Sequence, residues 1–448
     1  MNGLNKEILR LSLPSILANL TVPLVGMVDI AVAGHLPGGA AAFIGGISVG
    51  GLLFNLLYWN FFFLRASTGG LTAQAYGRQD TDDCVRILLR GAAAALLMAA
   101  LILLLQRPFL ALAGLVVESS PRVWALALRY FSIRVWAAPA TLSLMAIRGW
   151  FVGMQDSLSS MFTDLVVNTV NIAASIVLTL GIGGWAGLGF DGIALGTLVA
   201  QYTGLLFALL VCGIKYRRVF AGARLEGWLQ GLRGFLSMNA DLLLRSLSFT
   251  AIYMGFTILA ARMGDVLLAC SSIMMNILMV FSFFTDGFAY AGEALTGRFI
   301  GAGDEPMTRR TVRAVFAWSF ALAVVFVGVY HFGGGPLLQI MTSDEGVVSA
   351  CRPFLPWLLL MPPLGCAAFA WDGIYLGATA SRGIRNAMMG ALASFLLVWY
   401  AGVGLLHPSG PAALHLLLAA YFAHLLFRTV YLTAVYKKYV IKPHFTLC

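Results

Sequence analysis

The chain has little charge and few residues of the kinds that form metal sites or disulfide bonds. Only 11% of its residues are Asp, Glu, Lys or Arg, against about 25% in soluble domains. Its six cysteines and six histidines are scattered, with no C-x-x-C pair and no paired histidines. Segments of alternating polarity, typical of a membrane β-barrel, are absent. The sequence therefore argues against a soluble domain, a disulfide framework, a metal site and an enzyme with a metal or nucleophile constellation.

What the chain has instead is apolar sequence. Hydrophobic residues make up 60% of it, and the mean hydropathy is +0.87. Runs of about 20 apolar residues, long enough to cross ~30 Å of hydrocarbon as a helix, recur along its whole length. We therefore predict an all-α polytopic membrane protein with twelve transmembrane helices. The predicted spans are 11–34, 42–66, 87–105, 122–148, 160–181, 190–214, 236–262, 265–290, 311–332, 353–376, 386–406 and 412–435.

The second half of the chain repeats the first at an offset of 224 residues, which is half its length. GWFVG at 149–153 returns as GIYLG at 373–377, and Pro139 returns as Pro363. LTAQAYGRQD, which begins at Leu71, returns as LTGRFIGAGD. A repeat of this period in an apolar chain indicates two copies of one membrane unit. We predict two six-helix bundles with a cavity between them, an arrangement that favours a carrier over a channel.

The net charge of +10 comes from 29 Lys and Arg residues against 19 Asp and Glu residues. Most of these cations flank the predicted spans on one side, which is the positive-inside pattern and not a nucleic-acid surface. We therefore expect a plasma (inner) membrane protein with both termini in the cytoplasm, lipid neighbours and no nucleic-acid partner. It is expected to be a monomer. The predicted domains are an N-terminal lobe at 1–214, a cytoplasmic amphipathic linker at 215–235 and a C-terminal lobe at 236–448.

The linker, KYRRVFAGARLEGWLQGLRGF, is basic and carries apolar residues at helical spacing. This pattern is typical of a segment that lies on a membrane surface with its cations toward anionic headgroups. Two interpretations remain open. The linker is either a tether that lets the two lobes rock, or a simple connector.

Asp29 lies about 19 residues into the first predicted span, or roughly 28 Å along a helix. No Lys or Arg lies within a helical turn of it on that span. An ionisable group in hydrocarbon costs on the order of 2.5–3.5 kcal/mol, so its carboxyl group should face a cavity or a partner. We interpret Asp29 as a candidate protonation site. The alternative is an interfacial Asp at the end of the helix.

The fifth predicted span carries four polar residues at spacings of four, three and four. Such spacing places them on one stripe of a helix, and a polar stripe in a membrane faces protein or water rather than lipid. The members are Asp164, Asn168, Asn171 and Ser175. Thr197 and Gln201, four apart in the sixth span, are expected to join them. The stripe either couples protons or ions together with Asp29, or it only makes hydrogen bonds between helices.

The wider cavity is expected to be lined by polar, aromatic and methionine side chains, because such surfaces suit promiscuous binding. The candidates are Asn19, Met27, Tyr58, Gln201, Tyr253 and Met275. Packing in the core or against lipid is the alternative role for each of them.

The second half carries a different set of charges, which we predict to form a polar network near the cytoplasmic side. Its members are Asp241, Arg245, Asp286, Glu293 and Asp372. Asp241 and Arg245 are four residues apart and are predicted to pair with each other. The network either closes that side of the protein or forms a second ion or substrate site. Arg134, midway through the fourth span, needs a partner that the sequence does not identify.

Several long strings resemble the DinF branch of the multidrug and toxic compound extrusion (MATE) family, and the resemblance covers nearly the full chain. The strings are PLVGMVDIAVAGHL, FLRASTGGLTAQAYGRQD, RMGDVLLA, FTDGFAYAGEALTGRFIGAGD and WDGIYLGATASRGIRNAM. The resemblance implies an antiporter of two six-helix bundles that exports amphipathic, often cationic drugs by alternating access, driven by H⁺ or Na⁺.

The same resemblance assigns roles to single residues. It implies that Asp29 is the protonation site of the first span, and that Asn171 and Ser175 hold the fifth-span polar positions. Many relatives have Asp at the second of these positions, so this chain departs from a two-carboxylate site, for which Asp164 could compensate. The sixth-span pattern Gly-x-Ala-x-x-Thr ends at Thr197. Asp372 resembles a tenth-span Asp linked with ion coupling in the Na⁺-driven branch.

The expected function is therefore export of amphipathic or cationic organic compounds in exchange for H⁺, with no cofactor beyond the coupling ion. Na⁺-coupled export by the same fold is one alternative. A lipid-linked oligosaccharide flippase of the same superfamily is another, but it would need several cations deep in the cavity. Only Arg134 and Arg245 are identified as deep in the spans, which disfavours the flippase.

Overall fold

The computed structural model describes residues 2–37, 39–117, 119–224, 226–342 and 344–445. Within these ranges every regular element is a helix. Twelve helical stretches of the described chain are long and apolar enough to cross a membrane, and each coincides with one predicted span. The predicted fold class is therefore confirmed. Several helices extend beyond their apolar part, most clearly the eighth, which continues to Gly301 through a polar end that the hydropathy pattern did not include.

Packing divides the chain into two units. The N-terminal unit comprises Leu17–Ala75 and Asp80–Phe235, and the C-terminal unit comprises Met1–Ile16, Tyr76–Gln79 and Leu236–Cys448. The predicted lobes at 1–214 and 236–448 differ from these units in two segments of the first half. The start of the first helix and the turn at 76–79 both pack with the C-terminal unit.

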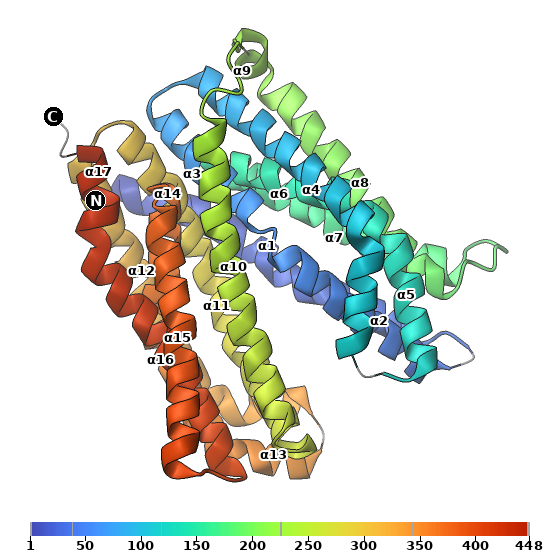
Figure 1. The fold of residues 1–448 in the computed structure, drawn as a ribbon. Coiled ribbons are helices and arrows are strands. Elements are labelled where there is room, and N and C mark those ends of the chain that lie inside the picture. Colours follow the sequence, from blue (N-terminus) through green and yellow to red (C-terminus); the bar gives the residue numbers. More distant parts are fainter. Residues whose placement is uncertain (1, 38, 118, 225, 343, 446–448) are drawn as a thin grey trace. The chain divides into compact units, whose positions relative to one another are not determined.

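The N-terminal unit contains the second half of the first helix and the helices up to residue 222, coloured from blue to green in Figure 1. These elements are α1 (Asn2–Gly34), α2 (Ala40–Trp59), α3 (Phe63–Gly77), α4 (Thr81–Val116), α5 (Pro121–Arg134), η1 (Val135–Ala137), α6 (Ala138–Gly153), α7 (Ser157–Leu180), α8 (Phe190–Lys215) and α9 (Arg217–Gly222). Its core is built around Trp150 and Phe151 of α6, against which Leu144, Val167 and Ala200 pack.

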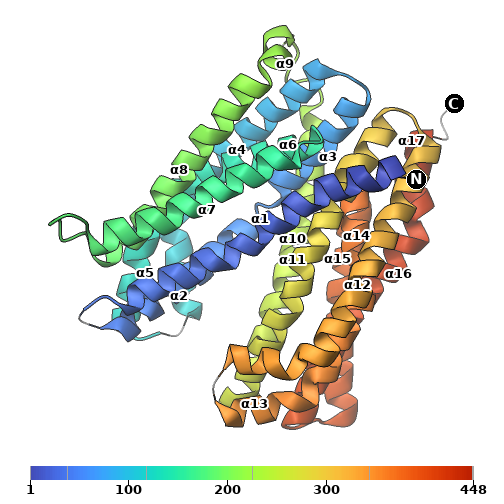
Figure 2. The ribbon, with the colours of Figure 1, turned by 180° about the vertical axis from the view of Figure 1, so that it is seen from behind.

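The C-terminal unit contains the remaining helices. These are α10 (Leu232–Ala261), α11 (Asp265–Gly301), α12 (Glu305–Met341), α13 (Glu345–Cys351), η2 (Arg352–Phe354), α14 (Leu355–Gly377), α15 (Ser381–Leu406), α16 (Pro411–Tyr436), η3 (Lys437–Ile441) and α17 (Lys442–Phe445). In both ribbon views α13 lies at one end of this unit, and α17 lies at the other end (Figures 1 and 2). A large apolar core, with Phe281, Phe354 and Phe395 fully buried, fills its interior.

The repeated glycines lie where helices cross at very short range. A Cβ atom on Gly149 of α6 would overlap the carbonyl oxygen of Arg65 of α3. A Cβ atom on Gly373 of α14 would overlap the carbonyl oxygen of Ala289 of α11. Residues 65 and 289 are themselves related by the offset of 224, so both units contain the same backbone-to-backbone crossing. The repeat of glycines in the sequence therefore records a repeat of close helix packing, which only a residue without a side chain permits.

The repeated aspartates Asp80 and Asp304 are helix N-caps. The Asp80 carboxylate accepts a hydrogen bond from the Asp83 amide, and the Asp304 carboxylate accepts one from the Met307 amide, at 2.9 Å in each case. Each follows a residue with positive φ, Gln79 or Gly303. Both carboxylates satisfy a backbone N–H that the first turn of a helix leaves without a partner. The aspartates of the repeat thus have a structural role in their turns.

The linker is held on the N-terminal unit through its backbone. Arg86 of α4 donates two hydrogen bonds to the carbonyl oxygen of Arg224, at 3.1 and 2.9 Å. One turn later, Arg90 donates to the carbonyl oxygens of Trp228 and Gln230, both at 2.6 Å. We refer to Arg86 and Arg90 together as the linker clamp. The clamp holds the linker through carbonyl oxygens of its backbone.

The α6–α7 turn of the N-terminal unit is joined to the end of α8 through Asp156. The Lys215 ammonium group donates to Asp156 at 2.6 Å, and the Tyr216 hydroxyl donates at 2.7 Å. Burial by itself would raise the pKa of Asp156, but the hydrogen bonds from Lys215, Ser159 and Tyr216 outweigh it and hold that pKa below its ordinary value. The ionised carboxylate therefore stabilises the folded state.

This arrangement predicts a pH-dependent contribution to stability. A lowered folded-state pKa means that the contribution is present above the ordinary Asp pKa of about 3.9 and disappears as the pH falls through the lowered value. We expect Asp156→Asn to lower the free energy of unfolding by about 1 kcal/mol at pH 7, because Lys215 is half exposed. Thermal unfolding of the detergent-solubilised protein should show this difference from pH 7 to 5, and the difference should shrink below about pH 4. A difference that grew on acidification would contradict the assignment.

Candidate ion-coupling site

Asp29 lies near the end of α1 in the N-terminal unit, and its side chain is only 5% exposed. The position is five residues before the last residue of the helix, so Asp29 belongs to the helix interior and is not an end-cap. Its Oδ1 atom has no hydrogen-bond partner among the described residues. A buried carboxyl oxygen without a donor is costly unless it binds a proton or an ion. This atom is therefore a candidate position for binding a proton or an ion.

The polar residues of α7 and α8 gather beside Asp29. The Asn171 amide donates to the Thr197 hydroxyl at 3.1 Å, and the Ser175 hydroxyl lies 3.5 Å from the Asn171 side-chain oxygen. Ser175 also interacts with the Asp29 carboxyl group. All four side chains are buried. The structure thus brings together Asp29, Asn171, Ser175 and Thr197, which the sequence predicted from three separate spans; their role in ion coupling stays a prediction.

Arg134, at the end of α5, is the cation of this cluster. Its guanidinium group acts electrostatically on Asp29 and donates a hydrogen bond to the Tyr130 hydroxyl at 2.7 Å. It also lies over the ring of Phe54, 4.7 Å from the ring centre, which is the geometry of a cation–π contact. The sequence did not identify a partner for Arg134. In the structure its partners are Asp29, Tyr130 and Phe54. Tyr130 and Phe54 could not be found by pattern, because aromatic residues are common in any span.

Two members of the predicted stripe have other partners. Asp164 forms an ion pair with Arg148 of α6 at 2.8 Å. Asn168 donates to the Thr21 hydroxyl at 2.6 Å. Asp164 therefore already has a cation, and it does not share the cluster around Asp29 as a second carboxylate. The polar residue of α7 that interacts with Asp29 is Ser175, so among the residues brought together here Asp29 is the carboxyl group.

The predicted cavity residues are dispersed over both units. Met27 is largely exposed, Asn19, Tyr58, Gln201 and Tyr253 are half-buried, and Met275 is 4% exposed within the apolar core of the C-terminal unit. Tyr58 belongs to the surroundings of Arg134, since the two groups interact electrostatically. Met275, by contrast, packs against side chains of the apolar core. Core packing was the alternative to a cavity-lining role for this residue.

The predicted pairing of Asp241 with Arg245 is wrong. Asp241 of α10 instead forms an ion pair with Arg385 of α15 at 2.6 Å and accepts a hydrogen bond from the Ser381 hydroxyl at 2.7 Å. Arg245 forms an ion pair with Asp372 of α14 at 2.6 Å. Helical spacing places residues four apart on one face, but each buried charge here reaches a different neighbouring helix. Intrahelical pairs need no partner helix and are weak, whereas these pairs join helices.

Asp372 is held by two arginines. Its Oδ2 atom accepts from Arg245 and from Arg428 of α16, both at 2.6 Å, and Arg428 is only 2% exposed. Arg428 was not among the predicted members of this network, although it is the one Lys or Arg within the twelfth predicted span. Asp286 and Glu293 lie on α11, where Glu293 is fully buried. Arg148 and Asp372, which share one repeat position, thus carry opposite charges, and each binds the opposite charge within its own unit.

No group of three or more His, Cys, Asp or Glu residues that could hold a metal occurs in the part of the chain that the structure describes. The oxygens around Asp29 are of the kinds that bind protons or alkali cations: one carboxylate, one amide and two hydroxyl groups. The geometry thus defines a buried polar site with one titratable anion and one fixed cation inside an apolar helical bundle. A membrane carrier is the class of protein to which this combination belongs.

Comparison with known proteins also identifies this chain as a membrane transporter. The family model MatE matches residues 14–177 and 242–399, one segment in each half of the repeat. The DNA damage-inducible protein F of Escherichia coli is 34% identical over 395 residues, which cover 88% of this chain and 85% of that protein. The human multidrug and toxin extrusion protein 1 is 25% identical over 89% of this chain and 68% of its own length.

Solved structures share the fold. The Vibrio cholerae MATE transporter VcmN in its bent form has a TM-score of 0.83, with 17% identity and 99% of each chain covered. An outward-facing multidrug resistance MATE family transporter has a TM-score of 0.78, covering 95% of this chain and 94% of that one. The chain belongs to the MatE family, and its expected place beside DinF is confirmed. It is a multi-pass membrane transporter and not an enzyme.

Proposed function

We propose that this chain is a secondary active antiporter that exports small amphipathic or cationic organic compounds in exchange for H⁺. The observation that carries the proposal is the burial of a single carboxyl group, Asp29, beside a fixed cation, Arg134. The names of the relatives, which refer to multidrug and toxin extrusion, support the substrate class. We place the protein in the inner membrane as a monomer with cytoplasmic termini, in accord with its Lys and Arg distribution.

The cluster suggests how proton uptake releases a cationic substrate. With Asp29 ionised, its charge and that of Arg134 offset each other, so an organic cation can approach the carboxylate. Uptake of one proton by Asp29 changes the charge of the pair from zero to +1. The cation then loses its attraction to the carboxylate and is repelled by the guanidinium group. Ser175 contacts the carboxyl group of Asp29, and Asn171 and Thr197 extend this polar cluster in an otherwise apolar region.

Alternating access completes the cycle. Loss of the substrate and of the charge on Asp29 allows the first helix to repack, and Pro23 within α1 marks a place where it can bend. The cavity then opens to the cytoplasm, where the proton leaves and a new substrate binds. One proton that moves inward through 100 mV supplies about 2.3 kcal/mol. This energy supports roughly a 50-fold gradient of a neutral substrate, since 1.4 kcal/mol corresponds to a factor of ten.

Transport by the purified protein in proteoliposomes tests the proposal. We expect efflux of a fluorescent organic cation such as ethidium to follow an imposed ΔpH, and to be unchanged by an imposed Na⁺ gradient at constant pH. Collapse of ΔpH with a protonophore serves as the control. Efflux that follows the Na⁺ gradient alone would replace proton coupling by Na⁺ coupling at the same oxygens. Efflux that follows neither gradient would reject the antiporter.

A further inference from the structure

The C-terminal unit has an aromatic counterpart of the ion-coupling cluster. The offset of 224 relates Asp29, Asn171, Ser175 and Thr197 to Tyr253, Phe395, Trp399 and Tyr421. Phe395, Trp399 and Tyr421 are each buried, and the Tyr421 ring packs edge-on against Phe256 at 5.7 Å. The position that holds the carboxyl group in one half of the chain is therefore occupied by an aromatic ring in the other, and none of these four residues carries a carboxyl group.

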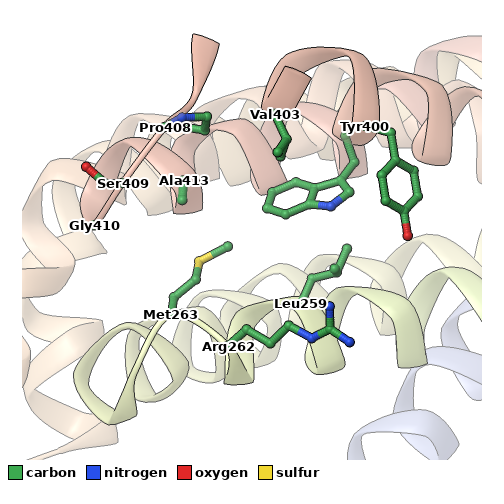
Figure 3. Close-up of a pocket in the computed structure, with 10 residues that line it drawn as sticks. Leu259, Arg262, Met263, Tyr400, Val403, Pro408, Ser409, Gly410 and Ala413 are labelled. Atoms are coloured by element: carbon green, nitrogen blue, oxygen red, sulfur yellow. The ribbon is translucent and has the colours of Figure 1, made fainter. Parts of the chain in front are cut away.

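A pocket opens from this aromatic cluster toward the end of the unit where α13 lies. It has a volume of about 460 Å³. Its lining comprises Leu259, Arg262 and Met263 at the end of α10, Trp399, Tyr400 and Val403 of α15, and Pro408, Ser409, Gly410 and Ala413 at the start of α16. Figure 3 shows Leu259, Arg262 and Met263 on one side, facing Tyr400, Val403 and Ala413 on the other.

Arg262 is the charged residue in this lining. It follows Ala261, the last residue of α10, and its guanidinium group has no ion pair or hydrogen bond among the described residues. The other lining side chains are apolar or aromatic, apart from Ser409. A guanidinium group above an apolar wall repels organic cations and attracts an anion, and it binds phosphate oxygens through two parallel hydrogen bonds. The pocket therefore favours anions, whereas the site around Asp29 favours cations.

The position of the pocket along the membrane-spanning helices indicates which kind of anion it would meet. The pocket lies where α10 ends at Ala261, where α15 ends at Leu406 and where α16 begins at Pro411. These are the ends of three helices that are long and apolar enough to cross a membrane, and the ends of membrane spans face the headgroup region. Trp, Tyr and Arg are the residues that concentrate at this level. Tyr400, Leu405 and Leu406, at or next to the pocket, are 64%, 81% and 71% exposed. The apolar wall of the pocket therefore extends onto an exposed apolar surface of the kind that faces lipid.

We propose that this pocket is a binding site for an anionic phospholipid. The phosphate of the headgroup lies on the Arg262 guanidinium group, and the upper part of one acyl chain lies along Leu259, Met263 and Val403. Trp399 forms the floor, where it contacts the chain. The proposal does not depend on which compound the protein transports, because it concerns the surface that the membrane itself supplies with ligand.

Quenching of tryptophan fluorescence by brominated lipids tests the proposal. The full chain is placed in phosphatidylcholine nanodiscs that contain increasing fractions of bromine-labelled phosphatidylglycerol or bromine-labelled phosphatidylcholine. The difference between wild type and Trp399→Phe isolates the signal of Trp399. We expect brominated phosphatidylglycerol to quench it at about a fivefold lower mole fraction, the factor that corresponds to the ~1 kcal/mol of one cation near anionic headgroups.

Three variants and one control complete the test. Arg262→Gln should remove the preference for phosphatidylglycerol, and Arg262→Lys should keep most of it. Val403→Phe, which fills part of the pocket without changing its charge and without adding a second tryptophan signal, should reduce quenching by both lipids. Arg352→Gln is the matched control, because Arg352 is an exposed cation of η2 outside the pocket. Equal quenching by the two lipids in the wild type, or a preference that survives Arg262→Gln, would overturn the proposal.

Discussion

Replacing Asp29 with asparagine should abolish ΔpH-driven export while leaving the fold intact. Asparagine has nearly the same shape and can keep the contact with Ser175, but it cannot take up a proton. Arg134 retains the Tyr130 hydroxyl and the Phe54 ring as neighbours, so no buried charge loses all of its partners. We expect the rate of ethidium efflux from proteoliposomes to fall by at least about 100-fold, the loss expected when a group that acts at every cycle is removed.

The matched control for this experiment is Asp191→Asn. Asp191 belongs to the same unit and is paired with Arg129, which is 62% exposed, at the start of α8. We expect its efflux rate to remain within about twofold of wild type, because exposed ion pairs contribute little. The melting temperatures of both variants should stay within ~2 °C of wild type. Unchanged efflux in Asp29→Asn would show that the proton binds elsewhere.

Replacing Asp372 with alanine should cause the largest loss of stability. Its Oδ2 atom is the shared acceptor of Arg245 and Arg428, so the substitution leaves two guanidinium groups inside the C-terminal unit without their anion. Removal of one partner of a buried ion pair costs about 3–5 kcal/mol, because the remaining charge is not solvated. We expect a marked fall in the melting temperature in detergent and a lower yield of folded protein in the membrane.

Glu305→Ala provides the comparison. Glu305 pairs with Arg309 one turn later on α12, and both side chains are more than one third exposed. The expected loss is below about 0.5 kcal/mol, since such pairs on a helix surface are weak. A second variant, Asp372→Asn combined with Arg428→Met, removes one cation along with the anion and should recover part of the loss. Equal melting temperatures for Asp372→Ala and Glu305→Ala would contradict the account of the three-residue group.

The sequence predicted the helices and the internal repeat because both depend on local or periodic information. A span is recognised from about 20 consecutive residues, and the crossings at Gly149 and Gly373 left their mark as glycines in corresponding places. The stripe from Asn171 to Ser175 was visible for the same reason, since both residues lie on one face of one helix. These features need no knowledge of which helix packs against which.

The partners of the charged residues could not be predicted in the same way. Helical spacing shows which face of α10 carries Asp241 and Arg245, but not that α15 meets one and α14 meets the other. The four-residue spacing therefore suggested a pair that the fold does not make. Arg134 shows the same limit, because its neighbours come from α1, α2 and its own helix. Tertiary packing decides which charges pair across helices. A single sequence shows only that a charged residue lies in an apolar span and needs a partner.

The linker clamp has a practical consequence for work on this transporter. Arg86 and Arg90 bind carbonyl oxygens of the linker, and every residue type supplies such an oxygen. The chemical identity of the linker side chains is therefore free to change while the hold on the backbone persists. Exposed positions between the bound carbonyls, such as Glu226 and Leu229, can carry a cysteine for a fluorophore or spin label. Spectroscopic distance measurements during transport thus have an attachment point that the fold itself keeps in place.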